Sequence, residues 1–286
     1  MRNLNQDTIT QAVIARLADT PDPRLKEVMT NLVQHLHAFA RETRLSESEW
    51  QAGIEFLTAV GQHCDSQRQE FVLLSDILGL STLTVTQNNE HPAGLTESTV
   101  MGPFYLADAP QVSPGDKLSA DRPGQPCRVS GRVAALDGAA IAGARVEVWH
   151  CDSDGLYDVQ QEQSQSRHCR GVLQTDAQGH YQIETIVAPS YPVTADGPVG
   201  RLLGAMAAHP WRPAHLHFRI SAPGFEPLVT HVYREGDPYL DSDVVYGVRE
   251  SLIVPWVEDE QGHCSLQFDF VLQRSAGAAA HAGGRG

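Results

Sequence analysis

The sequence predicts an α+β protein in which a helical N-terminal segment is followed by an antiparallel β-sandwich. In the first hundred residues, apolar side chains recur at every third or fourth position, which is the period of an amphipathic helix. After about residue 105 the apolar segments become short, rich in β-branched residues and partly alternating, as is typical of strands. Turn-forming sequences at 136–140, 176–179 and 222–227 separate these segments, and this spacing favours a sandwich.

The helical segment contains several patterns of its own. Apolar residues recur at three- and four-residue spacing at Leu25, Val28, Met29, Leu32, Val33 and Leu36. Within residues 45–57, Ser46 is followed three positions later by Glu49, which is the capping box that starts a helix. A further helical pattern covers 68–85 and ends where 87–94 become polar and include a proline. Few of these helices are long enough to be stable alone, so we expect them to pack against another surface.

Strands are expected in the remainder of the chain. They are predicted at residues 127–136, 144–150, 180–187, 214–220, 228–234 and 264–272. The last residues are of low complexity and are expected to be disordered. The predicted organisation is therefore a helical segment at 1–105, a β-sandwich at 106–274 and a disordered tail at 275–286.

The composition is that of an ordinary globular protein and argues against several kinds of partner. The formal net charge of −14 disfavours binding to nucleic acid or to an anionic membrane surface. No apolar run approaches the ~20 residues of a membrane-spanning helix, and the first ten residues lack the apolar core of a signal peptide. The five cysteines are scattered without a C-x-x-C pair, which disfavours disulfides and a thiolate zinc site. We therefore expect a cytoplasmic protein.

Two histidines, His215 and His217, stand one residue apart in the strand expected at 214–220. Residues i and i+2 of a strand point to the same face, so both imidazoles can converge on one metal ion. The spacing alone also fits two ordinary polar residues on a solvated face. Tyr157 and Tyr191 follow two of the expected strands, and by pattern alone each is a packing residue. The motifs of serine hydrolases and of nucleotide-binding loops are absent from the sequence.

Longer motifs resemble those of a known family. They read "ARVEVWHCDSDGLYD", "YPVTADGPVGRLL" and "HPWRPAHLHFRISAPG", with "TESTVMGPFYL" upstream and "GDPYLDSDVVYGVRESLIV" downstream. In this order and at these spacings they resemble the intradiol ring-cleavage dioxygenases over nearly the whole chain. Within that family the resemblance is greatest to the hydroxyquinol enzymes, with the catechol and chlorocatechol enzymes as close relatives. The family combines a helical N-terminal dimer interface with a β-sandwich that carries one ferric ion.

The resemblance implies a site and its partners. One Fe(III) per chain would be bound by Tyr157, Tyr191, His215 and His217, and two phenolates suit this ion because their charge offsets its own in a site of low dielectric. Tyr191 would also be an internal base, and Arg212 would lie over the substrate ring and stabilise charge that develops there. The implied partners are a catecholic substrate, O2 and a second copy of the chain. The resemblance leaves room for a phospholipid between the N-terminal helices at the dimer interface.

A substrate pocket is implied in the same way. Its lining would be Leu73, Asp76, Val100, Met101, Gly102, Pro103, Phe104, Val193 and Arg212. Asp76 would accept a hydrogen bond from a third ring hydroxyl and so favour hydroxyquinol over catechol, unless it is simply a solvated aspartate on a helix face. His231 stands where catechol-type members have glutamine. It either orients an oxygen ligand or Arg212, or it is a structural histidine.

The predicted reaction is intradiol (ortho) cleavage of hydroxyquinol (benzene-1,2,4-triol) with O2. The product would be 3-hydroxy-cis,cis-muconate, which equilibrates with maleylacetate, in the breakdown of aromatic compounds. Catechol or chlorocatechol is the alternative substrate. A non-catalytic β-sandwich binding module is an alternative of another class, and the intact set of two tyrosines, two histidines and an arginine argues against it. A zinc hydrolase is disfavoured because zinc prefers cysteine, histidine and carboxylate ligands.

Overall fold

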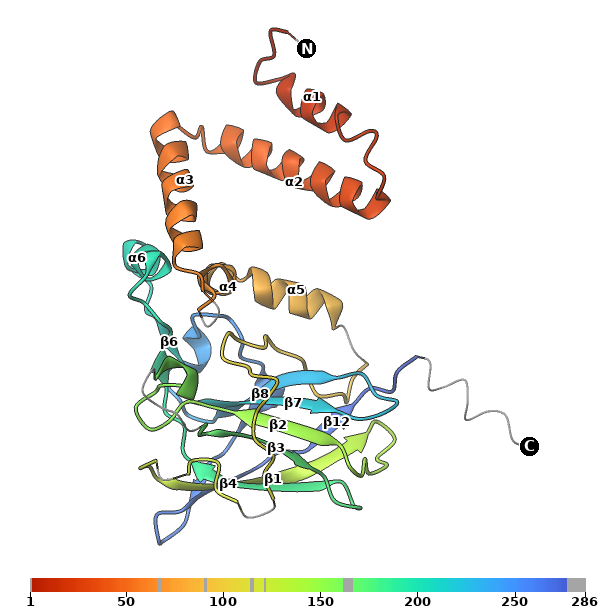
Figure 1. Ribbon diagram of the computed structural model, residues 1–286, viewed down its shortest axis with the longest axis vertical. Coiled ribbons are helices and arrows are strands. Elements are labelled where there is room, and N and C mark those ends of the chain that lie inside the picture. The colour runs from red at the N-terminus through yellow and green to blue at the C-terminus, as the bar shows by residue number, and fades with distance from the viewer. Residues whose placement is uncertain are drawn as a thin grey trace, which may run out of the picture. The chain divides into compact units, whose positions relative to one another are not determined.

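The chain forms two compact units, Met1–Ala59 and Val60–Gly286 (Figure 1). The computed structural model describes residues 2–65, 68–89, 92–113, 116–120, 122–161 and 167–276. Helices precede strands, as the sequence predicts. Helices α4 and α5 nevertheless belong to the second unit, because the boundary between the units follows residue 59. The tail predicted at 275–286 lies outside the described residues from position 277 onward.

The first unit is helical. Its helices are α1 (Ile9–Ala15), α2 (Pro23–Glu42) and most of α3 (Glu47–Gln62), which continues into the second unit. The carboxylate of Asp22 accepts the backbone N–H groups of Arg24 and Leu25, at 2.8 and 3.2 Å, and so caps the start of α2. The capping box predicted before α3 is confirmed: the N–H of Ser46 donates to Glu49, and the N–H of Glu49 donates to the Ser46 hydroxyl.

Helix α2 carries an exposed apolar stripe. Of its twenty described residues, none is buried. The stripe consists of Leu25, Val28, Leu32, Leu36 and Phe39, each 45–55% exposed. These positions recur at helical spacing and therefore lie on one face of α2.

The second unit is a β-sandwich. One five-stranded sheet contains β10 (Val257–Glu258), β11 (Cys264–Gln267), β1 (Pro126–Ala135), β12 (Phe270–Leu272) and β4 (His180–Ile186). The other has the order β3 (Arg170–Gln174), β2 (Arg145–Trp149), β7 (His215–Ser221), β8 (Leu228–Arg234) and β9 (Ile253–Val254). A two-stranded ribbon joins β5 (Tyr191–Pro192) to β6 (Trp211–Arg212). Figure 1 shows the two larger sheets stacked below α4 and α5.

Two details differ from the sequence prediction. The sheets are mixed, because β1 pairs in parallel with β11 and β12, and β8 with β9, while the other pairings are antiparallel. The single strand expected at 264–272 is split into β11 and β12. At the break, the carbonyl oxygen of Phe268 accepts the Tyr181 hydroxyl at 2.8 Å, and Asp269 accepts the N–H of Arg132 at 2.8 Å. These groups therefore bond outside the regular β-ladder.

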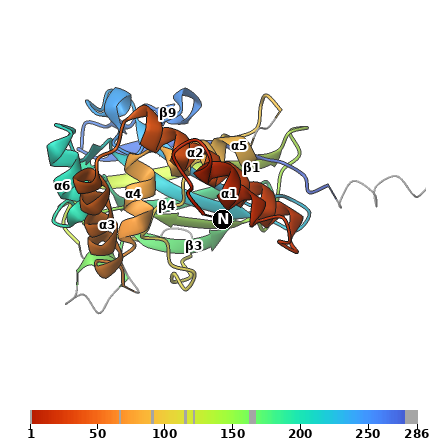
Figure 2. The ribbon, with the colours of Figure 1, turned by 90° about the horizontal axis from the view of Figure 1, so that it is seen from above.

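Three helices of the second unit lie beside the sandwich. They are α4 (Glu70–Ile77), α5 (Leu80–Asn88) and α6 (Pro198–Ala205). The continuous helix expected over 68–85 is interrupted at Gly79, whose φ of +71° suits glycine. Helix α4 packs against α6, and the buried carboxylate of Glu70 accepts the N–H of Val199 at 3.1 Å. This bond satisfies a free N–H at the start of α6. Seen from above, α4 lies over the strands of the sandwich (Figure 2).

The core lies between the two sheets. Alternate residues of β1 are buried, and side chains such as Val133, Phe218, Ile220 and Phe270 are fully enclosed. Burial of each side chain of this size contributes about 1.5–3 kcal/mol. Among the described helices there is none that combines the length and the apolar character needed to cross a membrane.

Candidate metal centre and substrate cavity

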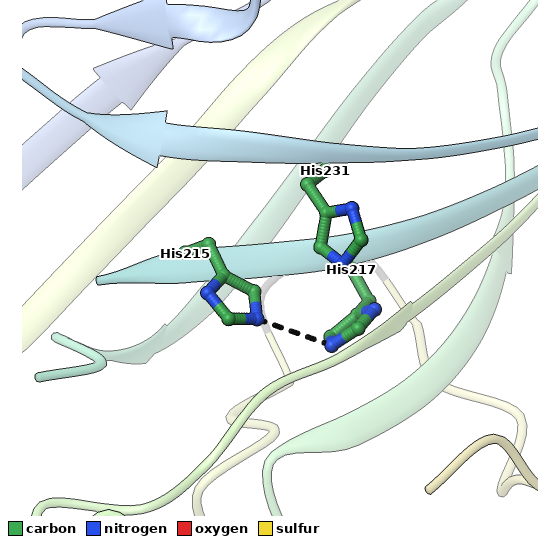
Figure 3. A group of neighbouring side chains, drawn as sticks. All are labelled: His215, His217 and His231. Carbon is green, nitrogen blue, oxygen red and sulfur yellow. Dashed lines mark hydrogen bonds between the residues drawn. The ribbon is translucent and has the colours of Figure 1, made fainter. Parts of the chain in front are cut away.

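Four polar side chains converge at one end of the second sheet. The Nε2 atoms of His215 and His217 lie 3.2 Å apart (Figure 3). The Nε2 of His217 is 3.0 Å from the hydroxyl oxygen of Tyr157, which is 3.3 Å from that of Tyr191. All four side chains are buried. The structure thus brings together the two histidines and the two tyrosines that the family resemblance predicts as ligands.

Strand pairing fixes the histidines. On β7 both side chains point to one face, as the i, i+2 spacing predicts. His217 lies opposite Trp149 of β2 and His231 of β8, and its ring stacks on Trp149 with centroids 4.9 Å apart. The Nδ1 atom of His215 lies 2.7 Å from the carbonyl oxygen of Pro213. Since a carbonyl only accepts, this Nδ1 carries the proton and the lone pair of Nε2 faces the site.

Loop contacts fix the tyrosines. Tyr157 precedes the 3₁₀ helix η1 (Asp158–Gln160), and its N–H donates to the Gln160 side chain at 2.9 Å. Arg170 binds the carboxylate of Asp158 and donates to the carbonyl oxygen of Phe104 at 3.0 Å. The Phe104 ring stacks on Tyr157 with centroids 4.4 Å apart. Tyr191, on β5, pairs with Arg212 on β6, so this ribbon delivers a predicted ligand and the predicted arginine together.

The electrostatics suit a cation in the middle of this set. Burial, together with the charge of Arg212, holds the pKa of both His215 and His217 well below the usual value, so both imidazoles are neutral. Burial raises the pKa of Tyr157 well above that of an ordinary phenol, and the nearby Tyr191 raises it further. Burial also raises the pKa of Tyr191, although the charge of Arg212 opposes this shift. Without a Lewis acid both phenols therefore keep their protons at neutral pH.

The donor set fits a metal ion. Ligand atoms about 2.1 Å from a metal and separated by 90–110° lie about 3.0–3.4 Å from one another. The three separations above, 3.2, 3.0 and 3.3 Å, have this size. Phenolates are hard oxygen donors that suit a trivalent ion such as Fe(III), whereas zinc prefers cysteine, histidine and carboxylate ligands.

A third histidine lies next to the first two. The ligand atoms of His215, His217 and His231 all lie within 4.8 Å of one another, and the rings of His217 and His231 have centroids 4.1 Å apart (Figure 3). The Nδ1 of His231 bonds the hydroxyl of Thr99, whereas its Nε2 has no partner among the described groups. Among the described groups, the Nδ1 of His231 is the acceptor within reach of the Thr99 hydroxyl. If the hydroxyl donates to it, the proton of the ring lies on Nε2, which makes His231 a hydrogen-bond donor toward the site.

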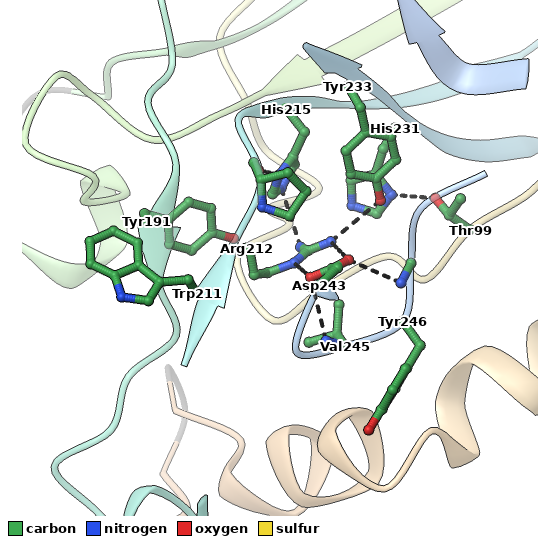
Figure 4. A network of polar contacts seen from close by, with 12 residues as sticks. Thr99, Tyr191, Trp211, Arg212, His215, His231, Tyr233, Asp243, Val245 and Tyr246 are labelled. Atoms are coloured by element: carbon green, nitrogen blue, oxygen red, sulfur yellow. Dashed lines mark hydrogen bonds and ion pairs between the residues drawn. The ribbon is translucent and has the colours of Figure 1, made fainter. Parts of the chain in front are cut away.

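Arg212 is buried beside His215, with Nη1 3.2 Å from the His215 Nε2 atom (Figure 4). Its Nε donates to one carboxylate oxygen of Asp243 at 3.0 Å, and its Nη2 lies 3.3 Å from the other. Sequence reasoning missed Asp243, which no periodicity or motif spacing distinguishes from a turn residue. A buried ion pair of this kind is costly to break from one side, because the remaining charge is left unpaired.

A cavity of about 410 Å³ opens onto the site. Of the residues that the resemblance predicts for the pocket, it is lined by Leu73, Asp76, Val100, Gly102, Pro103, Phe104, Val193 and Arg212. Met101 is not among the lining residues and is 36% exposed. Sequence reasoning missed Asp65, Arg68, Gln69, Glu70, Leu156, Val159, Gln160, Thr194, Asp196 and Val245. Most of these belong to loops or helix ends, which carry no periodic signal.

Asp76 differs from a solvated helix aspartate. Its side chain is only 4% exposed, and its Oδ1 atom has no hydrogen-bond partner among the described groups. Burial raises the pKa of this carboxyl group, partly opposed by a hydrogen bond from Ser81 and by the charge of Arg212. A buried acceptor without a partner is unfavourable unless a ligand supplies a donor.

Gly102 brings the backbone close to the predicted ligands. It has a φ of +73°, and a Cβ atom at this position would lie 3.1 Å from Cε1 of His217. A side chain here would therefore be strained and would press on the imidazole ring. The segment that lines the cavity passes directly over His217 because residue 102 is glycine.

Comparisons with known proteins agree with this geometry. The family profile described as "Dioxygenase" matches residues 100–274, and the profile described as "Catechol dioxygenase N terminus" matches residues 22–96. The 6-chlorohydroxyquinol 1,2-dioxygenase of Cupriavidus pinatubonensis is 57% identical over 95% of this chain and 99% of its own length. The hydroxyquinol 1,2-dioxygenase of a Rhizobium species is 45% identical over 94% of this chain and 96% of its own length.

A solved structure matches as well. The hydroxyquinol 1,2-dioxygenase from Pseudomonas putida DLL-E4 superposes with a TM-score of 0.88 and 40% identity, covering 94% of this chain and 99% of that chain. Fold, donor set and sequence thus define an oxygen-incorporating oxidoreductase, a dioxygenase. The chain belongs to the intradiol ring-cleavage dioxygenases, an iron-dependent family, as its motifs predict.

Proposed function

We propose that this enzyme opens the ring of hydroxyquinol between its two adjacent hydroxylated carbons, using O2. The product is 3-hydroxy-cis,cis-muconate, which equilibrates with maleylacetate. The observation that carries this choice is the buried Asp76, which lines the same cavity as Tyr191 and Arg212. Its Oδ1 atom has no hydrogen-bond partner within the described part of the chain. A third ring hydroxyl would satisfy that oxygen, and catechol has none to offer. The names of the relatives described above support the same substrate class.

We propose that Tyr157, Tyr191, His215 and His217 hold one Fe(III) per chain. Bound there, the ion would draw electron density from the diol and so make its ring reactive toward O2. The chain contributes the rest. Tyr191, as the phenolate that would hold the ion, takes a proton from a ring hydroxyl on its oxygen, Arg212 holds positive charge beside the ring, and the cavity excludes water. We assign His231 to the orientation of an oxygen ligand or of Arg212, because its buried Nε2, in a ring next to those of His215 and His217, has no partner among the described groups.

The substrate assignment is tested by comparing hydroxyquinol, 6-chlorohydroxyquinol, catechol and chlorocatechol as substrates. We expect kcat/KM to be highest for the two trihydroxylated rings, with a ring-opened diacid as product. In Asp76→Ala, kcat/KM should fall much more for hydroxyquinol than for catechol. Equal losses on both would remove Asp76 as the selecting residue. A colourless protein that contains zinc or no metal would contradict the iron assignment and favour a hydrolase or a binding module.

We also propose that the apolar stripe of α2 is buried in a homodimer, with room for a phospholipid beside it. An amphipathic helix with five half-exposed apolar residues is unfavourable in water unless another surface covers it. Light scattering of Leu32→Glu tests this, and we expect a dimer to become a monomer. Lipid extraction followed by mass spectrometry tests for the phospholipid. We place the enzyme in the cytoplasm, where its five unpaired cysteines stay reduced.

A further inference from the structure

The guanidinium group of Arg212 is held by one carboxylate, that of Asp243. Its Nε and Nη2 groups both point to Asp243, at 3.0 and 3.3 Å, and Nη2 also lies 3.5 Å from the Tyr233 hydroxyl (Figure 4). A two-point contact of this kind fixes the plane of a guanidinium as well as its position. Nη1 is the group left to face His215 and the metal site.

Asp243 is itself fixed by its own loop. Its Oδ2 accepts the N–H of Gly247 at 3.0 Å, and its Oδ1 lies 3.4 Å from the N–H of Val245. The loop comes close to the arginine at Gly247. A Cβ atom there would lie 3.2 Å from Arg212 Nη2 and 2.9 Å from the Tyr233 hydroxyl. Glycine is needed at this position for space and not for its φ, so a methyl group here would press directly on the guanidinium.

The other side of the loop is bound to helix α5. The hydroxyl of Thr82 donates to the carbonyl oxygen of Val245 at 2.9 Å, and Arg249 donates to Thr86 at 3.0 Å. The Tyr246 ring, which points toward the helices in Figure 4, is 3.6 Å from the position of a Cβ atom at Gly79. Residues 243–249 therefore connect α5 to the guanidinium of Arg212.

We propose that residues 243–249 are the positioning loop of Arg212, with Asp243 as the positioning residue. This inference rests on the role of Arg212 in the proposed function. It adds that the orientation of the guanidinium is set by packing on α5, the helix that follows the Asp76-bearing α4. Asp76 of α4 and Val245 of this loop both line the cavity, so neighbouring parts of its lining set where a third ring hydroxyl binds and where positive charge meets the ring. A displacement of about 1 Å at such a group can reduce a rate about 100-fold.

The test uses two substitutions that leave Arg212 and Asp243 unchanged. Gly247→Ala adds a methyl group against the guanidinium, and Thr82→Val removes the bond that ties the loop to α5. We expect kcat on hydroxyquinol to fall about 10–100-fold in Gly247→Ala and less in Thr82→Val, while KM changes little. The matched controls are Gly204→Ala, where a Cβ atom meets no described atom within 4 Å, and Thr84→Val, on the exposed side of α5. Both controls should keep the original kcat.

A second measurement does not depend on turnover. The NMR signal of the Arg212 Nε–H group is recorded with diamagnetic Ga(III) in place of Fe(III), because the ferric ion would broaden it, and is identified by its loss in Arg212→Lys. It should shift in Gly247→Ala, Thr82→Val and Asp243→Asn but not in the two controls. An unshifted signal in Gly247→Ala, or a shifted signal with unchanged kcat, would overturn the proposal. If the unmodified enzyme turned over no diol, the proposed function would fail. The NMR comparison would still decide whether the loop positions Arg212.

Discussion

The Nε2 atom of His217 lies 3.0 Å from the hydroxyl oxygen of Tyr157, although sixty positions separate the two residues in the sequence. One side chain comes from the central strand β7 and the other from the loop before η1. Each is held independently of the other, by strand pairing and by the contacts of Phe104 and Gln160. Contacts made by the chain itself therefore place these two donors side by side.

The two tyrosines should give the iron-loaded enzyme its colour. Charge transfer from phenolate to Fe(III) produces a broad visible band, so the purified protein should be red-brown. In Tyr157→Phe we expect this band to weaken strongly and the iron content to fall, because one anionic ligand is lost. Absorption spectra and metal analysis measure both effects. An unchanged band in Tyr157→Phe would show that this phenol does not bind the metal.

Metal uptake should release protons from phenols and not from imidazoles. The pKa values of Tyr157 and Tyr191 are raised by burial, whereas those of His215 and His217 are lowered well below neutrality. At neutral pH the empty site therefore holds protonated phenols and neutral imidazoles. Binding of Fe(III) should release about two protons per chain, so the affinity should fall as pH falls. Calorimetry in buffers of different ionisation enthalpy counts these protons, and Tyr157→Phe should release about one fewer.

Asp76 should reduce the stability of the free enzyme at neutral pH. Burial raises the pKa of this carboxyl group in the folded state, so the folded protein binds the proton more tightly than the unfolded chain does. Its contribution is thus favourable below the unfolded pKa and is lost as pH rises through the raised folded value. Asp76→Asn should therefore stabilise the protein at pH 7 by about 1–2 kcal/mol, and less at acid pH. Urea unfolding without substrate measures this, and a destabilised variant at pH 7 would contradict the assignment.

Gly131 should tolerate no side chain. It lies in β1 where this strand changes partner from β11 to β12, and a Cβ atom there would overlap the carbonyl oxygen of Phe268. That oxygen also accepts the Tyr181 hydroxyl, so it is not free to move. Gly131→Ala should reduce the free energy of unfolding by about 3 kcal/mol. Gly204→Ala, in a helix with open space around it, should be neutral or slightly stabilising. Thermal unfolding of both variants measures the two effects.

Much of this fold was predictable because it depends on local periodicity. The capping box at Ser46 and Glu49 and the alternating burial of β1 follow from spacing alone. The same is true of the common face of His215 and His217. The break at Gly79 was missed although glycine is a breaker, because the apolar pattern continues through it. The parallel pairings of β1 were missed because they depend on how distant segments cross between sheets.

Periodicity alone was not enough to predict the residues of the site. Tyr157 and Tyr191 are loop or edge residues, and a single tyrosine there has no pattern that distinguishes a ligand from a packing residue. Only the order of several motifs, as a family resemblance, indicated them. Asp243 was missed by both approaches, since it acts through Arg212, thirty-one positions earlier in the chain. Residues that act through another residue leave no spacing signal, because the contact exists only in three dimensions.

The close passage of Gly102 over His217 limits how this enzyme can change during evolution. Position 102 has no room for a side chain, since even one carbon atom would meet the imidazole ring. Val100, two positions before it, lines the cavity and can vary in size without adding an atom at position 102. New substrates are therefore expected to arise by exchange at position 100, while glycine stays at 102 and Phe104 keeps its stacking on Tyr157. The enzyme can in this way change its substrate preference among aromatic rings and keep the same metal chemistry.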